Sequence, residues 1–343
     1  MRPADEASDP FDVLGMGNAI VDVVAHADDA LLARLDLQKG AMTLVDEERS
    51  AFLYRNMPPG REVSGGSCGN TMAALAALGS RCAYVGRVRD DQLGNVFAHD
   101  IRAAGVSFEC RPSAVGPATA RSLIFVTPDA QRTMQTYLGA CVELGPDDVD
   151  PMLAGRASIT YLEGYLWDRP EAKEACRKAA DLCHAAGGRL ALTLSDAFCV
   201  DRWRAEFVNL VENEVDILFA NESEITSLYG VSDFDTALQE VRHHVQFAAL
   251  TRGAKGSVVV RGDEVHVIEA VRPTRVLDTT GAGDLYAAGF LHALTRGDDL
   301  AACGRLASVA AGAIIGQYGA RAERPLVEMI AELTGQAGPR SPA

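Results

Sequence analysis

The sequence predicts an α/β protein whose core is a doubly wound, mostly parallel sheet with helices on both faces. From about residue 146 onward, short apolar segments alternate with longer amphipathic segments, a pattern typical of parallel strands joined by crossover helices. The chain of 343 residues is 48% hydrophobic, which is enough to bury a large core. The first half breaks this alternation and contains two adjacent β-like runs, which predicts a small β-rich unit beside the main sheet.

Expected elements of the first half come in an irregular order. An apolar strand starts at Phe11 and ends in a glycine turn by Asn18; a short helix near 28–35, an apolar stretch at 42–45 and a turn at 58–60 follow. The loop from Ser64 to Asn70 opens a helix that ends near Gly79, a typical C-terminal capping residue. A strand, a turn and a helix start occupy 85–94. The two β-like runs, 122–127 and 133–138, flank a turn segment and predict a hairpin.

The second half is more regular. Expected strands are 159–162, 189–194, 217–220, 247–251, 257–260 and 265–268, and expected helices are 171–186, 203–212, 222–229, 299–318 and 323–333. A further helix follows the glycine-rich segment 278–284. Because ligands of open parallel sheets bind at the carboxyl ends of the strands, we expect the site there.

Composition excludes several kinds of function. The net charge of −15 argues against binding nucleic acid or an anionic membrane through a basic surface. No apolar run reaches the ~18 residues of a membrane span, and the acidic, polar N-terminus is unlike a secretory signal. These observations favour a soluble cytoplasmic protein in which helix N-termini and single arginines bind any phosphorylated ligand.

Cysteines and histidines give no metal-binding pattern. The 8 cysteines form no Cys-x-x-Cys pair, and several lie in apolar segments where a thiol serves as a small core residue. The adjacent His243 and His244 would point to different faces of a helix. We therefore expect reduced cysteines and no structural zinc.

Two glycine-containing segments invite nucleotide-binding interpretations that the spacing disfavours. In the segment that begins at Gly15, Ile20 replaces the third glycine of a dinucleotide fingerprint, and Asp22 comes far earlier than the acidic residue expected ~20 residues on. Lys255 lacks the spacing of a P-loop and is followed by Gly256 rather than by serine or threonine.

The heptapeptide 278–284, Asp-Thr-Thr-Gly-Ala-Gly-Asp, is the strongest candidate for chemistry. It follows β-like sequence and opens a helix, whose first turn has unpaired N–H groups and a partial positive charge suited to a phosphate. Gly281 and Gly283 let the backbone approach a ligand closely. Asp284, held ionised by the same helix terminus, would be available as a proton acceptor. A carboxylate that only caps the helix would give the same short motif.

The heptapeptide and the helix after it resemble the signature of the ribokinase-like (PfkB) family of carbohydrate and nucleoside kinases. The resemblance implies that Asp284 is the catalytic base and that the amides of Gly281, Ala282 and Gly283 form the anion hole. It extends, in family order, from about residue 11 to residue 333. It implies one kinase domain over 11–333 with lid segments at about 25–60 and 108–140, and flexible tails at 1–10 and 335–343.

The resemblance also implies an acceptor site. Its residues are Asn18, Asp22, Gly65, Gly66, Ser67 and Asn70 for the sugar hydroxyls and Tyr165 for stacking on a base. From the residues alone, Asp22 could simply end a strand in a turn, and 64–70 could be a flexible loop with a helix cap. The opening Met-Gly-Asn-x-x-x-Asp, the Gly-Gly-Ser-x-x-Asn turn and the segment Leu194–Phe198 look most like the adenosine kinase branch of the family.

The phosphate side follows from the same resemblance. Arg132 would reach the transferred phosphate, Thr251 and Gly253 would lie by the ATP, and Asn221 with Glu224 would act on a hydrated Mg²⁺. A capped helix start would have the same Asn-x-x-Glu sequence. The backbone around Asp278 and the turn 316–320 would lie near a K⁺ ion.

The expected activity is therefore ATP-dependent phosphorylation of the 5′-hydroxyl of a purine nucleoside, with adenosine as the first choice. A sugar kinase acting on ribose, fructose or a related sugar is the alternative, and a non-catalytic ligand-binding relative is disfavoured by the intact Asp284. We expect a monomer or a homodimer with small-molecule substrates only.

Overall fold

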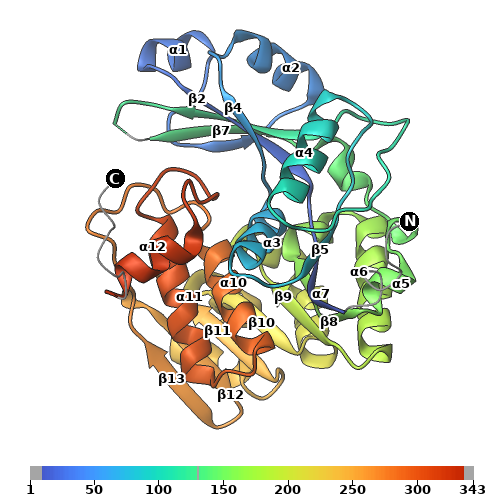
Figure 1. Ribbon diagram of the computed structural model, residues 1–343, viewed down its shortest axis with the longest axis vertical. Coiled ribbons are helices and arrows are strands. Elements are labelled where there is room, and N and C mark those ends of the chain that lie inside the picture. The colour runs from blue at the N-terminus through green and yellow to red at the C-terminus, as the bar shows by residue number, and fades with distance from the viewer. Residues whose placement is uncertain (1–9, 130, 336–343) are drawn as a thin grey trace, which may run out of the picture.

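The computed structural model describes residues 10–129 and 131–335, and these residues form two sheets. The large sheet has eight strands in the order β13-β12-β11-β10-β9-β8-β1-β5, and the small sheet has five in the order β3-β7-β6-β2-β4. In Figure 1 the small sheet, with α1 and α2 above it, forms the upper part of the molecule; α10, α11 and α12 lie at the lower left and α5 and α6 at the right. The predicted α/β class with a small β-rich unit is confirmed.

The large sheet is built from buried apolar segments. Its strands are β1 (Phe11–Met16), β5 (Cys82–Val85), β8 (Ala157–Glu163), β9 (Arg189–Thr193), β10 (Ile217–Asn221), β11 (Phe247–Thr251), β12 (Ser257–Arg261) and β13 (Glu264–Ile268). All pairings are parallel except β11 with β12 and β12 with β13. Successive side chains face opposite sides, so that Val13 and Leu14 enter different hydrophobic clusters. The sheet is therefore covered on both faces, as its apolar strands predict.

Each face of the large sheet is covered by its own set of helices. One cluster receives side chains of α3 (Ser67–Ala77), α4 (Gln92–Ala103), α10 (Ala282–Thr295), α11 (Leu300–Ile314) and α12 (Leu326–Leu333). The other receives those of α5 (Pro151–Ala154), α6 (Pro170–Ala185), α7 (Ala197–Asn213), α8 (Glu222–Tyr229) and α9 (Phe234–Val241). Each crossover thus places the carboxyl end of a strand beside the start of a helix.

The small sheet contains β2 (Ile20–His26), β3 (Met42–Leu44), β4 (Arg61–Ser64), β6 (Ala120–Val126) and β7 (Arg132–Tyr137), with α1 (Asp29–Arg34) and α2 (Glu47–Asn56) in its connections. β6 and β7 pair antiparallel as the predicted hairpin, and β2 pairs parallel with β6. The strands of the small sheet therefore come from 20–64 and 120–137, whereas the expected lid segments were about 25–60 and 108–140. Residues 108–119 contribute no strand to this sheet. Most of the two expected tails lies outside the described residues.

Several elements differ from the expectations. β2, β4, α2, α5 and α9 were not predicted. Much of α2 is exposed, so its composition shows little amphipathic pattern, although Asp46 caps it by accepting from the Arg49 amide at 2.8 Å. The helix expected near 203–212 begins at Ala197, with Trp203 in a non-helical conformation. α11 ends earlier and α12 begins later than expected, which leaves a longer turn at 315–325.

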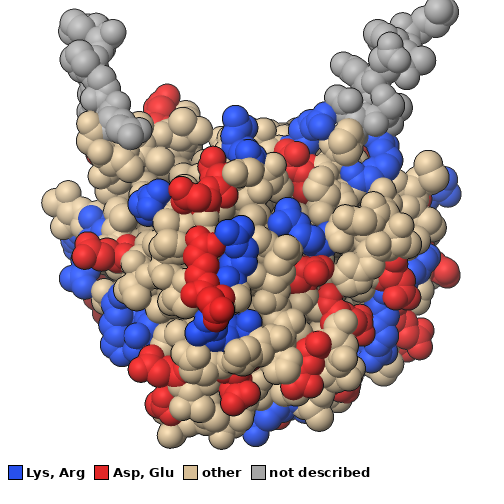
Figure 2. Space-filling model, turned by 90° about the horizontal axis from the view of Figure 1, so that it is seen from below, with Lys and Arg blue, Asp and Glu red and all other residues tan. Residues whose placement is uncertain are grey.

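Charge is dispersed over the surface. Figure 2 shows Lys and Arg interspersed with Asp and Glu over the face remote from the small sheet. Within the two described ranges, no helix is long and apolar enough to cross a membrane. All eight cysteines lie in these ranges, and none forms a disulfide.

Candidate active site

A cavity of about 630 Å³ lies where the carboxyl ends of β1, β8, β9 and β10 face the small sheet. The small sheet contributes Met42, Leu44 and Met134 to its lining, and Met42 and Leu44 are exposed apolar side chains. The cavity brings together most of the predicted site residues. Those that line it are Asn18, Asp22, Gly66, Ser67, Asn70, Tyr165, Asn221, Glu224, Thr251, Gly281, Gly283 and Asp284.

The N-terminus of α10 forms the floor of the cavity. Gly281 adopts φ +79°, and a Cβ there would collide with Ala320, so that only glycine fits the turn. No side chain caps the helix, and the amides of Gly283 and Asp284 have no acceptor among the described residues. The amide of Ala282 instead donates to the Thr279 carbonyl oxygen at 3.2 Å. Free amides at a helix N-terminus fit an anionic oxygen. Of the three amides predicted for this role, those of Gly281 and Gly283 have no acceptor among the described residues, whereas that of Ala282 does.

Asp284 stands in the first turn of α10 and is tied to α3. Its Oδ1 accepts from the Ser67 hydroxyl at 2.7 Å, and its Oδ2 accepts from the Asn70 side-chain amide at 3.0 Å. Burial raises the pKa of Asp284, although both hydrogen bonds and the charge of Arg321 oppose the rise. Burial therefore opposes the ionised form of Asp284, which the helix terminus was expected to favour. A raised pKa suits a general base better than that of a surface carboxylate.

Asp22 projects from β2 toward the same cavity. Burial raises the pKa of Asp22 to about 6, and the charges of Arg132 and Arg321 oppose the rise. Gly65 lies against its carboxylate, and the Gly65 amide donates to the Ile20 carbonyl oxygen at 2.7 Å. Asp22 therefore does more than end a strand: it lines the cavity near the free amides of α10.

Gly66 makes the turn from β4 into α3. It has φ +81°, and a Cβ at this position would collide with the carbonyl oxygen of Asn18. Asn18 itself is buried at the end of β1, where Glu163 accepts from its backbone amide and its side-chain amide, both at 2.8 Å. The loop after β1 and the start of α3 are therefore packed directly against each other.

Sequence reasoning missed Glu163, the last residue of β8. This carboxylate is 1% exposed and also accepts from the Cys68 amide at 2.9 Å, so it joins the end of β1 to the first turn of α3. Burial raises the pKa of Glu163 to about 7. A glutamate at the end of an apolar strand, directly before Gly164, was the available signal.

Arg321 was missed as well. It lies in the turn between α11 and α12 and donates from Nε to the Ser64 carbonyl oxygen at 2.9 Å. Its position in an irregular, weakly patterned segment gave no signal in the sequence.

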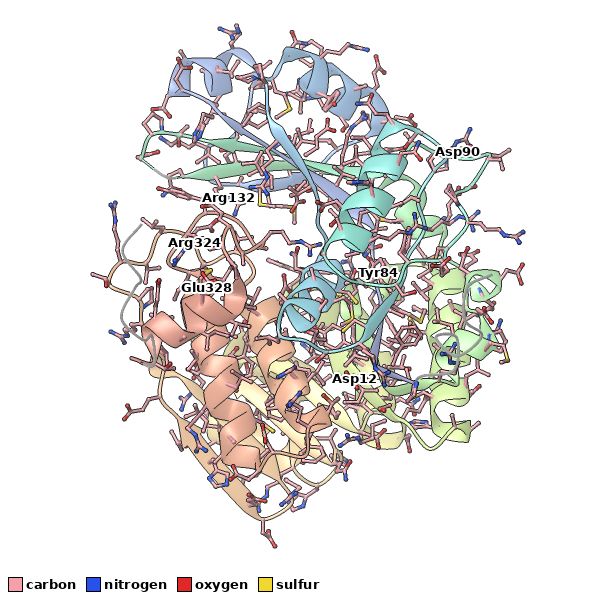
Figure 3. All side chains as sticks on the ribbon, in the orientation of Figure 1. Asp12, Tyr84, Asp90, Arg132, Arg324 and Glu328 are labelled. Atoms are coloured by element: carbon pink, nitrogen blue, oxygen red, sulfur yellow. The ribbon has the colours of Figure 1, made fainter. Side chains whose placement is uncertain are left out.

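Arg132 begins β7 and forms an ion pair with Asp278 across the two parts of the molecule. Figure 3 shows Arg132 at the edge of the small sheet that faces the loops above α12. The Asp278 carboxylate also accepts from the Gly319 amide at 2.8 Å and the Thr280 amide at 2.9 Å. The Nε of Arg132 is buried without a partner. Arg132 thus has an unused donor beside the glycine turn.

The segment 278–280 and the turn 316–320, where the resemblance implied a K⁺ ion, are joined by the hydrogen bond from the Gly319 amide to Asp278. The amides of Leu277 and Asp278 both approach the Ile315 carbonyl oxygen, at 2.8 and 3.4 Å. Within the described ranges, no group of three or more His, Cys, Asp and Glu side chains could hold a metal ion. Backbone carbonyl oxygens would have to provide most ligands of a cation at this place.

Asn221 and Glu224 form a capping box at the start of α8. The Asn221 side chain accepts from the Glu224 amide at 2.9 Å, and Glu224 accepts from the Asn221 backbone amide at 2.9 Å. Burial raises the pKa of Glu224 to about 7. A divalent cation beside the carboxylate would hold it ionised, so the pair fits a hydrated Mg²⁺ while it also caps the helix.

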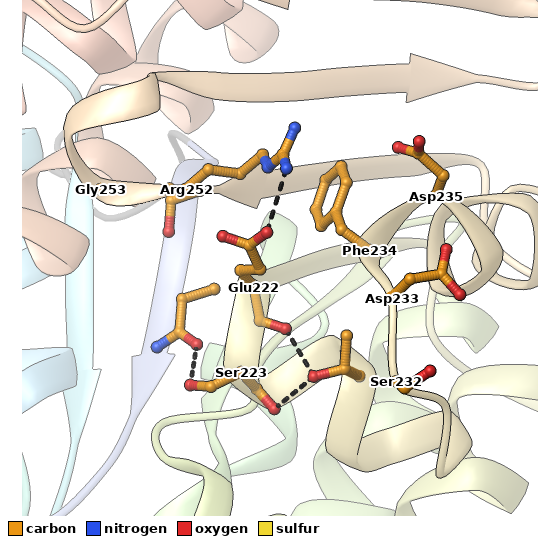
Figure 4. Close-up of a pocket in the computed structure, with 11 residues that line it drawn as sticks. Glu222, Ser223, Ser232, Asp233, Phe234, Asp235, Arg252 and Gly253 are labelled. Carbon is orange, nitrogen blue, oxygen red and sulfur yellow. Dashed lines mark hydrogen bonds and ion pairs between the residues drawn. The ribbon is translucent and has the colours of Figure 1, made fainter.

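A second cavity, of about 710 Å³, adjoins the first at Asn221 and Thr251 and also contains Gly253. Figure 4 shows Arg252 directed toward Glu222, to which it donates at 3.0 Å, with the Phe234 ring beside the guanidinium. The Arg252 guanidinium carbon lies 4.2 Å from the centre of that ring. Thr251 therefore stands between the two cavities, whereas Gly253 lines only the second.

Tyr165 follows β8 and lines the central cavity with a side chain that is 38% exposed. Its hydroxyl donates to the Ser195 carbonyl oxygen at 3.4 Å. Ser195 has φ +71°, which is unusual for a residue with a side chain, and it leads into the exposed Phe198 on α7. Two partly exposed aromatic side chains, Tyr165 and Phe198, thus line the central cavity.

Comparison with known proteins relates most of the chain to one family. Residues 56–326 match the model of the pfkB family of carbohydrate kinases. The adenosine kinase from Sinorhizobium meliloti is 51% identical and superposes with a TM-score of 0.86, covering 96% of this chain and 100% of that chain. A probable sugar kinase from Rhizobium etli CFN 42 is 48% identical, with a TM-score of 0.87 and the same coverage. An uncharacterized sugar kinase from Archaeoglobus fulgidus is 27% identical over 73% of this chain and 98% of its own length.

Proposed function

The chain belongs to the pfkB family of carbohydrate kinases, and on that basis we propose that it transfers the γ-phosphoryl group of ATP to the 5′-hydroxyl of a purine nucleoside, adenosine first. The observation that carries the proposal is the pairing of Asp284 with free amides at the start of α10. A proton acceptor and an anion-binding helix terminus lie in one turn, facing one cavity.

The roles of the protein groups follow from their positions. Asp284 accepts the proton of the attacking hydroxyl, while the amides of Gly283 and Asp284 donate to the oxygens on which negative charge develops. Ser67 and Asn70 hold the Asp284 carboxylate in one orientation, with hydrogen bonds of 2.7 and 3.0 Å. The unpartnered Nε of Arg132 is available to the same oxygens.

Asp22 and Asn18 face the sugar of the acceptor. A carboxylate can accept from two vicinal hydroxyls at once, and such charge-assisted hydrogen bonds are stronger than neutral ones. The apolar Met42, Leu44 and Met134 of the small sheet and the ring of Tyr165 offer surfaces for a flat base. These surfaces favour a nucleoside over a free sugar.

ATP would lie along the Asn221–Thr251 edge, where the two cavities meet, and supplies the phosphoryl group when bound. Asn221 and Glu224 would hold a hydrated Mg²⁺ that neutralises the phosphates. The carbonyl oxygens of 278–280 and of the turn 316–320 would hold K⁺. The chain from residue 11 to residue 333 would work as one kinase domain, in which the small sheet acts as the lid.

A sugar kinase is the second candidate, because the similar Rhizobium etli protein is named a probable sugar kinase. The test is ADP release from MgATP over a panel of adenosine, other nucleosides, ribose, fructose and a deoxygluconate. A higher kcat/KM for a free sugar than for adenosine would transfer the assignment to that sugar. If none of these acceptors is phosphorylated, both the nucleoside kinase and the sugar kinase proposals are wrong.

A further inference from the structure

Arg321 connects three parts of the fold. Its Nε and Nη2 donate to the carbonyl oxygen and the hydroxyl oxygen of Ser64, each at 2.9 Å, at the end of β4. Ser64 in turn donates to Oδ2 of Asp100 on α4, from its amide at 2.7 Å and from its hydroxyl at 2.6 Å. The guanidinium is thereby fixed between the turn after α11, the small sheet and α4.

This fixed charge lies beneath the acceptor site. Asp22 on β2 pairs with Val63, the neighbour of Ser64 on β4. On the other side, Nη2 of Arg321 faces Gly69 in the first turn of α3, where an added Cβ would lie 3.9 Å from it. That same turn of α3 holds Asp284 through Ser67. Arg321 therefore contacts the strand that neighbours Asp22 and faces the helix turn that holds Asp284.

The two carboxylates present an electrostatic problem. The proposed chemistry needs both ionised, yet burial raises the pKa of each, and Asp284 raises that of Asp22 further. The charged groups that face Asp22 are Arg132, Arg321 and Asp284, and Arg321 also faces Asp284. The buried Glu163 is a further carboxylate that feels the charge of Asp284.

Of the two arginines, only Arg321 acts on both carboxylates. The charge of Arg132 has the larger effect on Asp22, but Arg132 is paired with Asp278 and is proposed to act on the phosphate. Arg321 is held by Ser64. Lysine could not replace it fully, because only a guanidinium can donate in parallel to two oxygens of Ser64.

We propose that Arg321 is a positioning residue of the acceptor site: its guanidinium, fixed on Ser64, places one positive charge next to the strand of Asp22 and the helix turn that holds Asp284, and it ties the turn after α11 to the end of β4. The inference rests on the proposed function, since it assumes that these two carboxylates bind and deprotonate the acceptor.

The test compares Arg321→Gln with wild type in the pH dependence of kcat/KM for the best acceptor found in the panel. The measured quantity is the ratio of kcat/KM at pH 8 to kcat/KM at pH 6. If kcat/KM falls on the acidic side with a pKa of about 6, this ratio is about 2. If that pKa rises by one unit, the ratio increases to about 10. We expect at least this increase for Arg321→Gln. The matched control is Arg324→Gln, which removes the same charge from the same turn at an exposed side chain and should leave the ratio unchanged.

Two further variants separate charge from scaffolding. Ser64→Ala removes the hydroxyl contact but keeps the guanidinium, and Arg321→Lys keeps the charge but loses the paired hydrogen bonds. Both should lower kcat/KM equally at pH 6 and pH 8. These variants also keep the inference testable if Arg321→Gln does not fold. If the acidic limb of Arg321→Lys moved by as much as one pH unit, that result would contradict the inference.

A loss of kcat/KM in Arg321→Gln that is equal at all pH values would overturn the inference and leave Arg321 a structural residue. Failure of the proposed function would look different: wild type would then phosphorylate no acceptor, or Asp284→Asn would keep its turnover.

Discussion

Replacing Asp284 by asparagine should abolish most turnover while the fold stays intact. In the structure the two carboxylate oxygens accept from Ser67 and Asn70. An asparagine can reproduce both contacts, because its oxygen can accept from Asn70 while its amide donates to the Ser67 hydroxyl, which can also act as an acceptor. The substitution therefore removes the base without leaving a buried polar group unpaired.

The expected loss in kcat follows from the role of the base. General-base catalysis typically contributes ~10²–10⁴-fold, and a factor of 10² corresponds to about 2.7 kcal/mol in activation free energy. Binding of ATP should persist, because the amides of Gly283 and Asp284 belong to the backbone. Turnover is measured by ADP release, and ATP binding by calorimetry.

The thermal stability of Asp284→Asn gives an independent readout, because Tm should not fall although turnover does. The pKa of Asp284 is raised above its ordinary value of 3.8. The folded state then binds the proton more tightly, and the associated stability is present below pH about 4 and is lost as the pH rises through the folded pKa. At pH 7.5 the ionised carboxylate is thus an unfavourable buried charge, so Tm of Asp284→Asn should equal or exceed that of wild type.

The matched control is Asp298→Asn, which changes the charge of an exposed aspartate just after the other end of α10. It should change neither kcat nor Tm. Near-normal turnover in Asp284→Asn would refute the catalytic role and leave Asp284 as a helix-start residue. A large fall in Tm would refute the argument that asparagine satisfies the same contacts.

Three further substitutions test other parts of the site. Arg132→Ala should lower kcat by ~10²-fold with little change in KM for the acceptor, since its proposed partner is the phosphate in transfer; a raised KM at equal kcat would place Arg132 in ground-state binding. Wild type should prefer adenosine to 2′-deoxyadenosine, because a missing hydroxyl leaves buried groups unpaired at a cost of ~1–3 kcal/mol, and Asp22→Ala should remove that preference in kcat/KM. Tyr165→Ala should lower kcat/KM for adenosine by about tenfold and leave any activity on free sugars unchanged; equal losses on both would make Tyr165 a packing residue.

Local sequence determined the large sheet and the glycine turn that opens α10. Buried parallel strands need apolar residues on both faces, so that β8 to β11 were visible as apolar runs. The turn at 278–284 needs glycine at φ +79° and a carboxylate one helical turn on, and both requirements are local. The prediction of where Asp284 lies was therefore possible without any tertiary information.

Only the tertiary structure decided the pKa of Asp284 and the interaction partners of Arg132 and Arg321. The pKa of Asp284 depends on burial beneath a sheet whose strands come from 20–64 and 120–137, which no local pattern contains. Arg132 and Asp278 are 146 residues apart in the chain, and Arg321 and Ser64 are 257 apart. Such contacts follow from how crossovers and turns bring chain segments together, so composition and spacing cannot reveal them.

The sequence by itself thus determined that a carboxylate and a glycine-rich helix N-terminus share one turn, because both come from adjacent residues. Only the tertiary structure decided which charges surround that base. Glu163 and Arg321 are ordinary in sequence: one ends an apolar strand, and the other lies in an irregular turn. Their roles arise from burial and proximity, since a carboxylate 1% exposed must find donors and a partly buried guanidinium must find acceptors, and those partners lie far away along the chain.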